Sequence, residues 1–114
     1  MEKPMYPPAS RDIGQTREEL APEILNTFRA FSHQVFADGA LPSKTKELIA
    51  VAVAHVTQCP YCIRSHTKRA RLKGATEQEI MEAIWVAAQM RAGAAIAHSA
   101  LAIDTMNEEE GKAE

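Results

Sequence analysis

Apolar side chains recur at intervals of three and four positions along most of this chain, which is the spacing of one face of an α-helix. The pattern predicts a first helix that starts at Glu18 or Pro22, runs to Ala37 and is ended by Asp38-Gly39. Its apolar stripe consists of Leu20, Ile24, Leu25, Phe28, Phe31, Val35 and Phe36.

Two further helices are predicted between residues 43 and 74. The first has Ser43 as its N-cap and ends near Thr57, and it is apolar on almost every side, as expected of a helix that is buried all round. The second starts after Cys59 with Pro60 at its first position, where the missing N–H of proline would be unpaired anyway. It ends by Gly74, because glycine is the usual residue just past a helix.

The remaining helical pattern starts at a capping box, Thr76-Glu77-Gln78-Glu79, and extends to about residue 106. Gly93 predicts a break or kink between two helices within this stretch. Residues 83–103 contain few charges, but polar side chains and many alanines argue against a membrane span. The interrupting polar residues are Gln89, Arg91, His98 and Ser99.

The predicted organisation is an all-α protein of five to six helices. Residues 1–15 are expected to form an extended arm because Pro4, Pro7 and Pro8 disfavour a helix; the arm is either frayed or packed on a neighbouring subunit. Residues 16–106 are expected to form a single helical domain, and residues 107–114 an exposed acidic tail. Two segments, 48–56 and 83–103, are apolar on more faces than one small core covers, so an oligomer is expected.

The composition and the cysteine spacing indicate which partners, compartment and chemistry to expect. The chain has 114 residues, of which 46% are hydrophobic, and a formal charge of -2, which gives no electrostatic basis for binding nucleic acid or an anionic membrane. Its two cysteines lie three positions apart and no apolar signal core begins the sequence. These features favour a cytoplasmic protein with redox or metal chemistry.

Cys59 and Cys62 are the first candidates for that chemistry. At the start of a helix, unpaired N–H groups and the helix dipole favour an anion, so both thiols are expected to be more acidic than a free cysteine. His66 follows Cys62 by four positions and shares its helix face. Glu47 lies in the apolar helix before them, where burial would raise its pKa toward that of a general acid or base.

These four residues form the pattern Glu-x11-Cys-x-x-Cys-x3-His, which resembles the alkylhydroperoxidase D-like, carboxymuconolactone decarboxylase superfamily over about residues 20–105. The resemblance implies that Cys62 attacks a hydroperoxide, that Glu47 and His66 relay protons, and that Cys59 closes a disulfide. It implies a dithiol or lipoyl-type reductant, no bound cofactor or metal, and trimers or hexamers. Tyr61 stands where some members have a second histidine. Decarboxylase members typically lack the cysteine pair, which favours the redox branch.

Other interpretations of the same residues stay open. Cys59, Cys62 and His66 could join a fourth ligand in a zinc site, and each candidate could be purely structural. His55, Tyr61 and His98 are possible pocket residues, although His55 and His98 are equally typical of hydrogen-bonded core or interface positions. The alternatives to a peroxide reductase or disulfide oxidoreductase are an enzyme that decarboxylates or isomerises a lactone acid with Glu47 and His66 and without sulfur chemistry, and a non-catalytic oligomerisation module.

Overall fold

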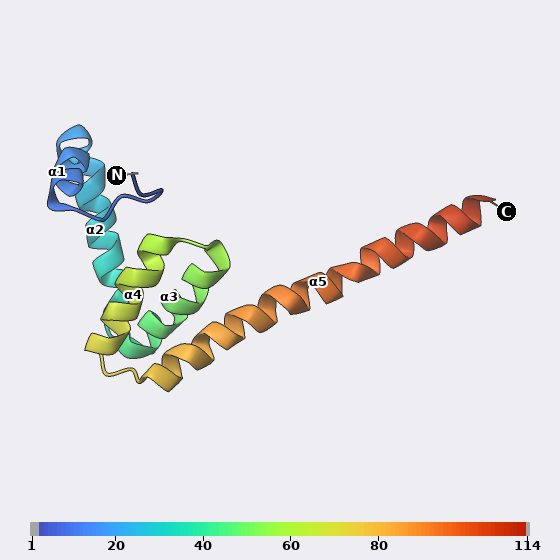
Figure 1. The fold of residues 1–114 in the computed structure, drawn as a ribbon. Helices are drawn as coiled ribbons and strands as arrows, with labels where there is room; N and C mark the ends of the chain where they lie inside the picture. Colours follow the sequence, from blue (N-terminus) through green and yellow to red (C-terminus); the bar gives the residue numbers. More distant parts are fainter. Residues whose placement is uncertain (1–2, 114) are drawn as a thin grey trace. The chain divides into compact units, whose positions relative to one another are not determined.

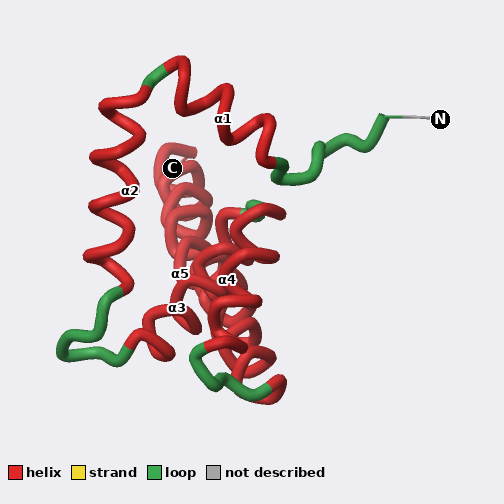
Figure 2. The backbone as a smooth tube through the Cα atoms, turned by 90° about the vertical axis from the view of Figure 1, so that its left-hand side faces the viewer, coloured by secondary structure: helices red, strands yellow, loops and turns green. Residues whose placement is uncertain are grey.

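A computed structural model describes residues 3–113 of the chain. The described residues form helices joined by loops and contain no strand (Figures 1 and 2), which confirms the all-α prediction. The five helices are α1 (Arg11–Leu20), α2 (Pro22–Phe36), α3 (Ser43–Thr57), α4 (Pro60–Leu72) and α5 (Glu77–Ala113).

The chain divides into two compact units, an N-terminal unit (Met1–Lys46) and a C-terminal unit (Glu47–Glu114), with the boundary inside α3. In the N-terminal unit, α1 packs against α2; in the C-terminal unit, α4 packs against α5. The single domain expected over residues 16–106 stays a prediction. Helical periodicity locates apolar faces, but it does not reveal which of those faces pack on one another.

The extended arm predicted for residues 1–15 is wrong from Arg11 onward, because α1 begins there. All three prolines precede this point, and the Ser10 hydroxyl accepts a hydrogen bond from the Ile13 amide at 3.3 Å, which caps the new helix. The expected start at Pro22 is confirmed for α2, where proline occupies the first turn. Met1 and Glu2 lie outside the described residues.

The start of α3 also differs from the sequence-based expectation. Ser43 is already helical, and the Asp38 carboxylate accepts its backbone N–H at 2.7 Å, so Asp38 satisfies this helix end from five residues upstream. Lys46, in the first turn of α3, donates from Nζ to the carbonyl of Ala37, where the loop after α2 begins, at 2.6 Å. The carboxylate and the ammonium together hold the connection between α2 and α3.

The core of the C-terminal unit is small and aliphatic. Val51, Ala70, Ala75 and Ile80 are buried in one cluster, and Leu48 and Ile84 pack against it. Small residues on α4 and after it allow the backbones to approach α3 closely. This core fixes α3 beside α4, which is the arrangement that the candidate site requires.

The capping box at the start of α5 is confirmed in both directions. The Thr76 hydroxyl accepts the Glu79 amide at 3.0 Å, and the Glu79 carboxylate accepts the Thr76 amide at 2.8 Å. The expected break at Gly93 is wrong, because α5 continues through it to Ala113. A glycine inside a helix costs about 1 kcal/mol relative to alanine, which a helix of this length tolerates. The acidic tail is exposed where its burial is described, but it is helical as far as Ala113, and Glu114 lies outside the described residues.

Apolar side chains on α5 remain exposed in the single chain. Trp85 is 68% exposed and Ile96 is 75% exposed, and Val86, Met90 and Leu101 are similar. Within the C-terminal unit, the second half of α5 projects beyond α3 and α4 (Figure 1). No helix among the described residues has both the length and the apolarity needed to cross a membrane.

This exposure predicts self-association, because an apolar surface of this extent is unfavourable in water. Light scattering at micromolar concentration should give a mass that is a multiple of the 12.5 kDa chain. Trp85→Glu, which places a charge on the exposed face, should lower that mass, whereas Glu82→Gln should leave it unchanged. A monomer mass for the unmodified chain would contradict the expectation.

The capping box predicts the effect of a small substitution. Thr76→Ala removes the hydroxyl that accepts the Glu79 amide and should lower the free energy of unfolding by about 1 kcal/mol. Thr105→Ala is the matched control, because the Thr105 hydroxyl bonds only the Leu101 carbonyl one turn back in the same helix. Urea unfolding at one fixed protein concentration measures the free energy of unfolding of both variants. An equal decrease in the two variants would rule out a contribution from the cap.

Candidate functional site

The site begins at the junction of α3 and α4. Gln58 has a φ of 58°, so the backbone is left-handed there, and the Cys59 amide donates to the Ala54 carbonyl at 3.2 Å. Pro60 then starts α4, with Cys59 as its N-cap, as the sequence predicts. This tight turn places both cysteines at the beginning of a helix, where the backbone N–H groups have no partner within the helix.

The two sulfur atoms lie side by side as free thiols. Cys59 Sγ and Cys62 Sγ are 2.9 Å apart, and the Cys62 backbone N–H donates to Cys59 Sγ at 3.3 Å. Cys59 therefore uses its side chain as the cap of α4, an unusual role for cysteine that brings the Cys62 and Tyr61 amides to its sulfur. Both residues are half-buried.

The surroundings of the two thiols shift their pKa values in opposite directions. Hydrogen bonds from the Cys62 thiol and the Cys62 amide lower the pKa of Cys59. The same thiol contact raises the pKa of Cys62, and burial and the negative charge on Cys59 add to that increase. The expectation that both thiols are more acidic than free cysteine is therefore wrong for Cys62. One proton is shared between the sulfurs, so the first ionisation opposes the second.

A carboxylate and an imidazole connect α3 to α4 in the same unit. Glu47 Oε2 lies 2.7 Å from His66 Nδ1, and the side chain of Glu47 is only 3% exposed against 15% for His66. A carboxylate oxygen accepts, so His66 Nδ1 is the donor in this contact. Proton exchange between His66 and a second group would then use the other ring nitrogen, Nε2.

The structure thus brings the four predicted residues together as two pairs within one unit. Cys62 and His66 are one helical turn apart on α4, so the imidazole of one pair and a sulfur of the other lie on the same side of that helix. A thiolate, a thiol, an imidazole and a buried carboxylate can together perform nucleophilic attack, proton transfer and disulfide formation.

Arg91 is a residue that sequence reasoning treated only as an interruption of an apolar stretch. From α5, its guanidinium Nη1 donates to the Val56 carbonyl at 2.6 Å, three residues before Cys59. This bond satisfies a carbonyl in the last turn of α3 and brings a cation to the negative end of that helix. A lone arginine within the alanine-rich segment was the available signal, since such a charge requires a partner.

The three possible pocket residues are in different settings. His55 Nδ1 donates to the Val51 carbonyl at 2.7 Å within its own helix, and Tyr61 is partly exposed between the two cysteines. His98 is exposed on α5, about 10 Å of helix beyond Arg91 at 1.5 Å per residue. Among the described residues, no three His, Cys, Asp or Glu side chains are arranged to hold a metal ion.

The fold agrees with comparisons to known proteins. Residues 22–105 match the carboxymuconolactone decarboxylase family, and the chain belongs to that family. A protein of Paracoccus denitrificans, known as uncharacterized protein 4 in the cox locus, is 58% identical over 105 residues, which cover 92% of this chain and 94% of the relative.

Two solved structures extend the comparison. A protein from Methanobacterium thermoautotrophicum has a TM-score of 0.70 at 36% identity, covering 75% of this chain and 98% of that one. A carboxymuconolactone decarboxylase family protein from Thermotoga maritima, for which involvement in an antioxidative response has been suggested, has a TM-score of 0.54 at 34% identity. That match covers 77% of this chain and 96% of that protein.

The shared proton predicts how substitution at one cysteine changes the other. Cys62→Ala removes the thiol donor and should raise the pKa of Cys59, so the rise of alkylation rate with pH should move to higher pH. Cys62→Ser keeps a hydroxyl donor and should move the profile less. Iodoacetamide labelling of Cys59 across pH 5 to 9 gives the measurement, and identical profiles for the two variants would contradict the shared-proton interpretation.

The Arg91 bond predicts a local stabilising role. Arg91→Gln should lower the free energy of unfolding by about 1 kcal/mol, because the Val56 carbonyl loses a charged donor. Arg69→Gln is the control, since Arg69 is exposed on α4 and takes part in no side-chain hydrogen bond among the described residues. Urea unfolding of both variants at one protein concentration gives their free energies of unfolding. Equal values for the two variants would contradict the role assigned to Arg91.

Proposed function

We propose that this protein is a thiol-dependent peroxide reductase in which Cys59 and Cys62 carry the electrons and Glu47 and His66 move the protons. The observation that carries the proposal is the pair of sulfur atoms 2.9 Å apart at the start of α4, with a buried carboxylate–imidazole pair joining α4 to α3. The suggested antioxidative role of the Thermotoga maritima relative supports the same direction. A reducing compartment such as the cytoplasm suits a cycle that starts from free thiols.

The proposed reaction has three balanced steps. A thiolate attacks one oxygen of a hydroperoxide, so that an S–O bond forms, the O–O bond breaks, and the alcohol leaves after taking one proton. The second thiol then displaces water from the sulfenic acid and closes the disulfide. An external dithiol supplies two electrons, and it becomes a disulfide as Cys59 and Cys62 return to thiols.

Cys62 is the proposed attacking sulfur, because it is the cysteine that shares a helix face with His66. Because the pKa of Cys59 is lowered and that of Cys62 is raised, Cys59 is the sulfur that ionises more readily, so in this proposal Cys62 gives up its proton as the S–O bond forms. That proton can pass to the adjacent Cys59 sulfur or to His66. A thiolate from the less acidic thiol is also the stronger intrinsic nucleophile, which favours Cys62 once it is deprotonated.

Glu47 is the proposed orienting group of the relay. Its carboxylate holds His66 Nδ1 at 2.7 Å and would stabilise an imidazolium when His66 takes a proton. Among the described residues this carboxylate has no other side-chain partner, so its position depends on His66 and on burial in α3. Cys59 completes the cycle as the sulfur that closes the disulfide and meets the reductant.

The assignment of the two sulfurs is tested with single variants. Cys59→Ser should consume one equivalent of hydroperoxide and then stop, with a sulfenic acid trapped on Cys62, because no second thiol can close the disulfide. Cys62→Ser should consume almost none. Mass spectrometry after dimedone trapping locates the modification, and a sulfenic acid on Cys59 formed at full rate in Cys62→Ser would reverse the assignment.

The relay is tested by Glu47→Gln. Loss of the carboxylate should slow peroxide consumption by about 100-fold, the lower end of the usual contribution of acid–base catalysis. Glu82→Gln, on an exposed carboxylate of α5, is the matched control and should leave the rate unchanged. Stopped-flow measurement of the first turnover separates this step from reduction by the dithiol.

The same variants distinguish the alternative functions. Turnover of a lactone acid that survives Cys59→Ala/Cys62→Ala would indicate the decarboxylase reaction for which the family is named. Thiols that remain unreacted after a stoichiometric amount of hydroperoxide would indicate a module without this activity. Either outcome would overturn the peroxide reductase proposal.

A further inference from the structure

The cations of the C-terminal unit are concentrated on one helix. Between Glu47 and Glu77 the sequence contains no Asp or Glu but has five Lys and Arg residues, although the whole chain has a net charge of -2. These five are Arg64, Lys68, Arg69, Arg71 and Lys73, and all are exposed. Arg71 donates to the Ala75 carbonyl, and the other four take part in no side-chain hydrogen bond or ion pair among the described residues.

The helix dipole accounts for only part of this cluster. Cations are favoured near the negative end of a helix, and the effect is confined to the last turn. Arg69, Arg71 and Lys73 meet that condition at the end of α4, but Arg64 and Lys68 lie too early in the helix to benefit. Their charge therefore gives no evident advantage to the folded chain itself.

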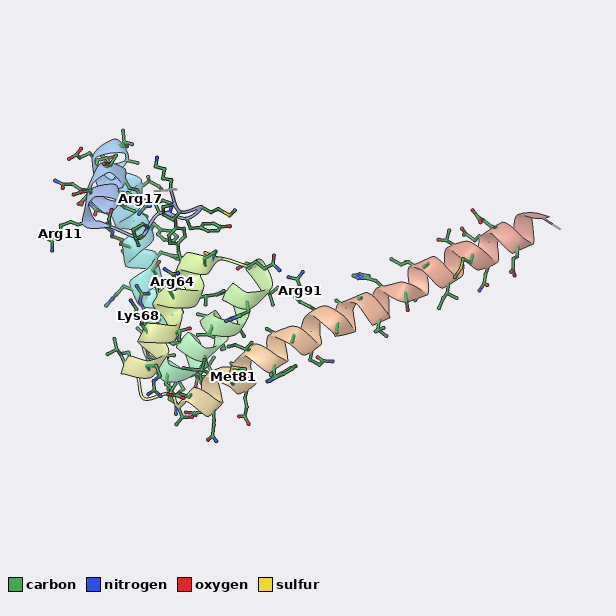
Figure 3. The ribbon with its side chains drawn as sticks, in the orientation of Figure 1. Arg11, Arg17, Arg64, Lys68, Met81 and Arg91 are labelled. Atoms are coloured by element: carbon green, nitrogen blue, oxygen red, sulfur yellow. The ribbon has the colours of Figure 1, made fainter. Side chains whose placement is uncertain are left out.

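Arg64 and Lys68 belong to a stripe that starts at the cysteine pair. With Tyr61 and Leu72 they follow the spacing i, i+3, i+7 and i+11, which places all four on one helix face. Tyr61 is 39% exposed and Leu72 is 84% exposed, so the stripe has two cations between two apolar side chains along the sequence of α4. Figure 3 labels the two cations, Arg64 and Lys68, on this helix. Pro60 and Tyr61 lie between Cys59 and Cys62 in the sequence, so the stripe begins next to Cys62, at the end of α4 that carries the sulfur atoms.

We propose that this stripe, formed by Tyr61, Arg64, Lys68 and Leu72, docks an acidic protein that carries the reducing dithiol. The inference rests on the proposed function, in which an external dithiol must approach the disulfide. The complementarity is one of charge: the helix offers cations with no partner among the described residues, so an acidic surface beside the dithiol would be attracted and oriented. The transfer needs no further reagent. The partner's thiolate attacks one sulfur, the Cys59–Cys62 bond breaks, and the partner's second thiol completes its own disulfide while two electrons pass to the cysteines.

The test uses synthetic dithiol peptides of equal length, one with four glutamates and one with four lysines beside a Cys-x-x-Cys pair. The full-length protein is first oxidised with diamide, so the experiment does not depend on peroxide. At low salt, the glutamate peptide should reduce the disulfide about tenfold faster than the lysine peptide, because opposite charges accelerate encounter. The difference should shrink as salt rises above about 0.1 M, where the screening length is near 10 Å.

Arg64→Glu/Lys68→Glu should abolish or reverse the preference for the glutamate peptide while leaving reduction by dithiothreitol unchanged. Arg11→Glu/Arg17→Glu changes the net charge by the same amount on exposed residues of α1 and should keep the preference. A preference absent from the unmodified protein, or one that survives the α4 reversal, would overturn the docking proposal. Circular dichroism of both double variants verifies that they are folded.

Two other outcomes separate this inference from its alternatives. If the α4 reversal changes the mass by light scattering, the stripe contacts a second copy, such as its exposed Glu108–Glu110 segment, and the proposal fails. If diamide forms no disulfide between Cys59 and Cys62, the reductant docking and the proposed function fail together. A third outcome is that the disulfide forms and dithiothreitol reduces it, but the two peptides reduce it at the same rate. That result would contradict only the docking proposal and would leave the proposed function unchanged.

Discussion

The buried carboxylate of Glu47 is the constraint on which the C-terminal unit depends. A carboxyl group buried in an apolar helix is costly unless it has a hydrogen-bond partner, and His66 is the partner that the structure supplies. To meet it, α4 must lie beside α3 in one register, and the chain must turn back within two residues. The left-handed Gln58 and the proline that starts α4 are the local features that allow that turn.

Local chemistry made much of this unit predictable from the sequence. Pro60 and Gly74 mark the ends of α4, and the Thr76–Glu79 capping box marks the start of α5, because each acts within a few residues of itself. The spacing of Glu47, Cys59, Cys62 and His66 predicted two helices with chemistry at their junction. The observed pairs, Glu47 with His66 and Cys59 with Cys62, follow from that arrangement.

The features that escaped prediction depend on contacts or on competing local effects. Arg91 reaches Val56 across 35 positions, and no sequence pattern specifies that bond. Gly93 was expected to interrupt α5, but its intrinsic preference is weak against the helix around it. The unequal acidity of the thiols arises because one sulfur donates to the other, whereas the helix dipole alone would favour ionisation of both.

The shared proton has a consequence for the charge of the site. When two coupled groups titrate in separate steps, the region between the steps holds one proton and one negative charge, whatever the pH within it. The cysteine pair thus keeps the same net charge over this range of pH, which forms a plateau, rather than at a single pH value. A group placed one helical turn away therefore experiences the same neighbouring charge throughout that plateau.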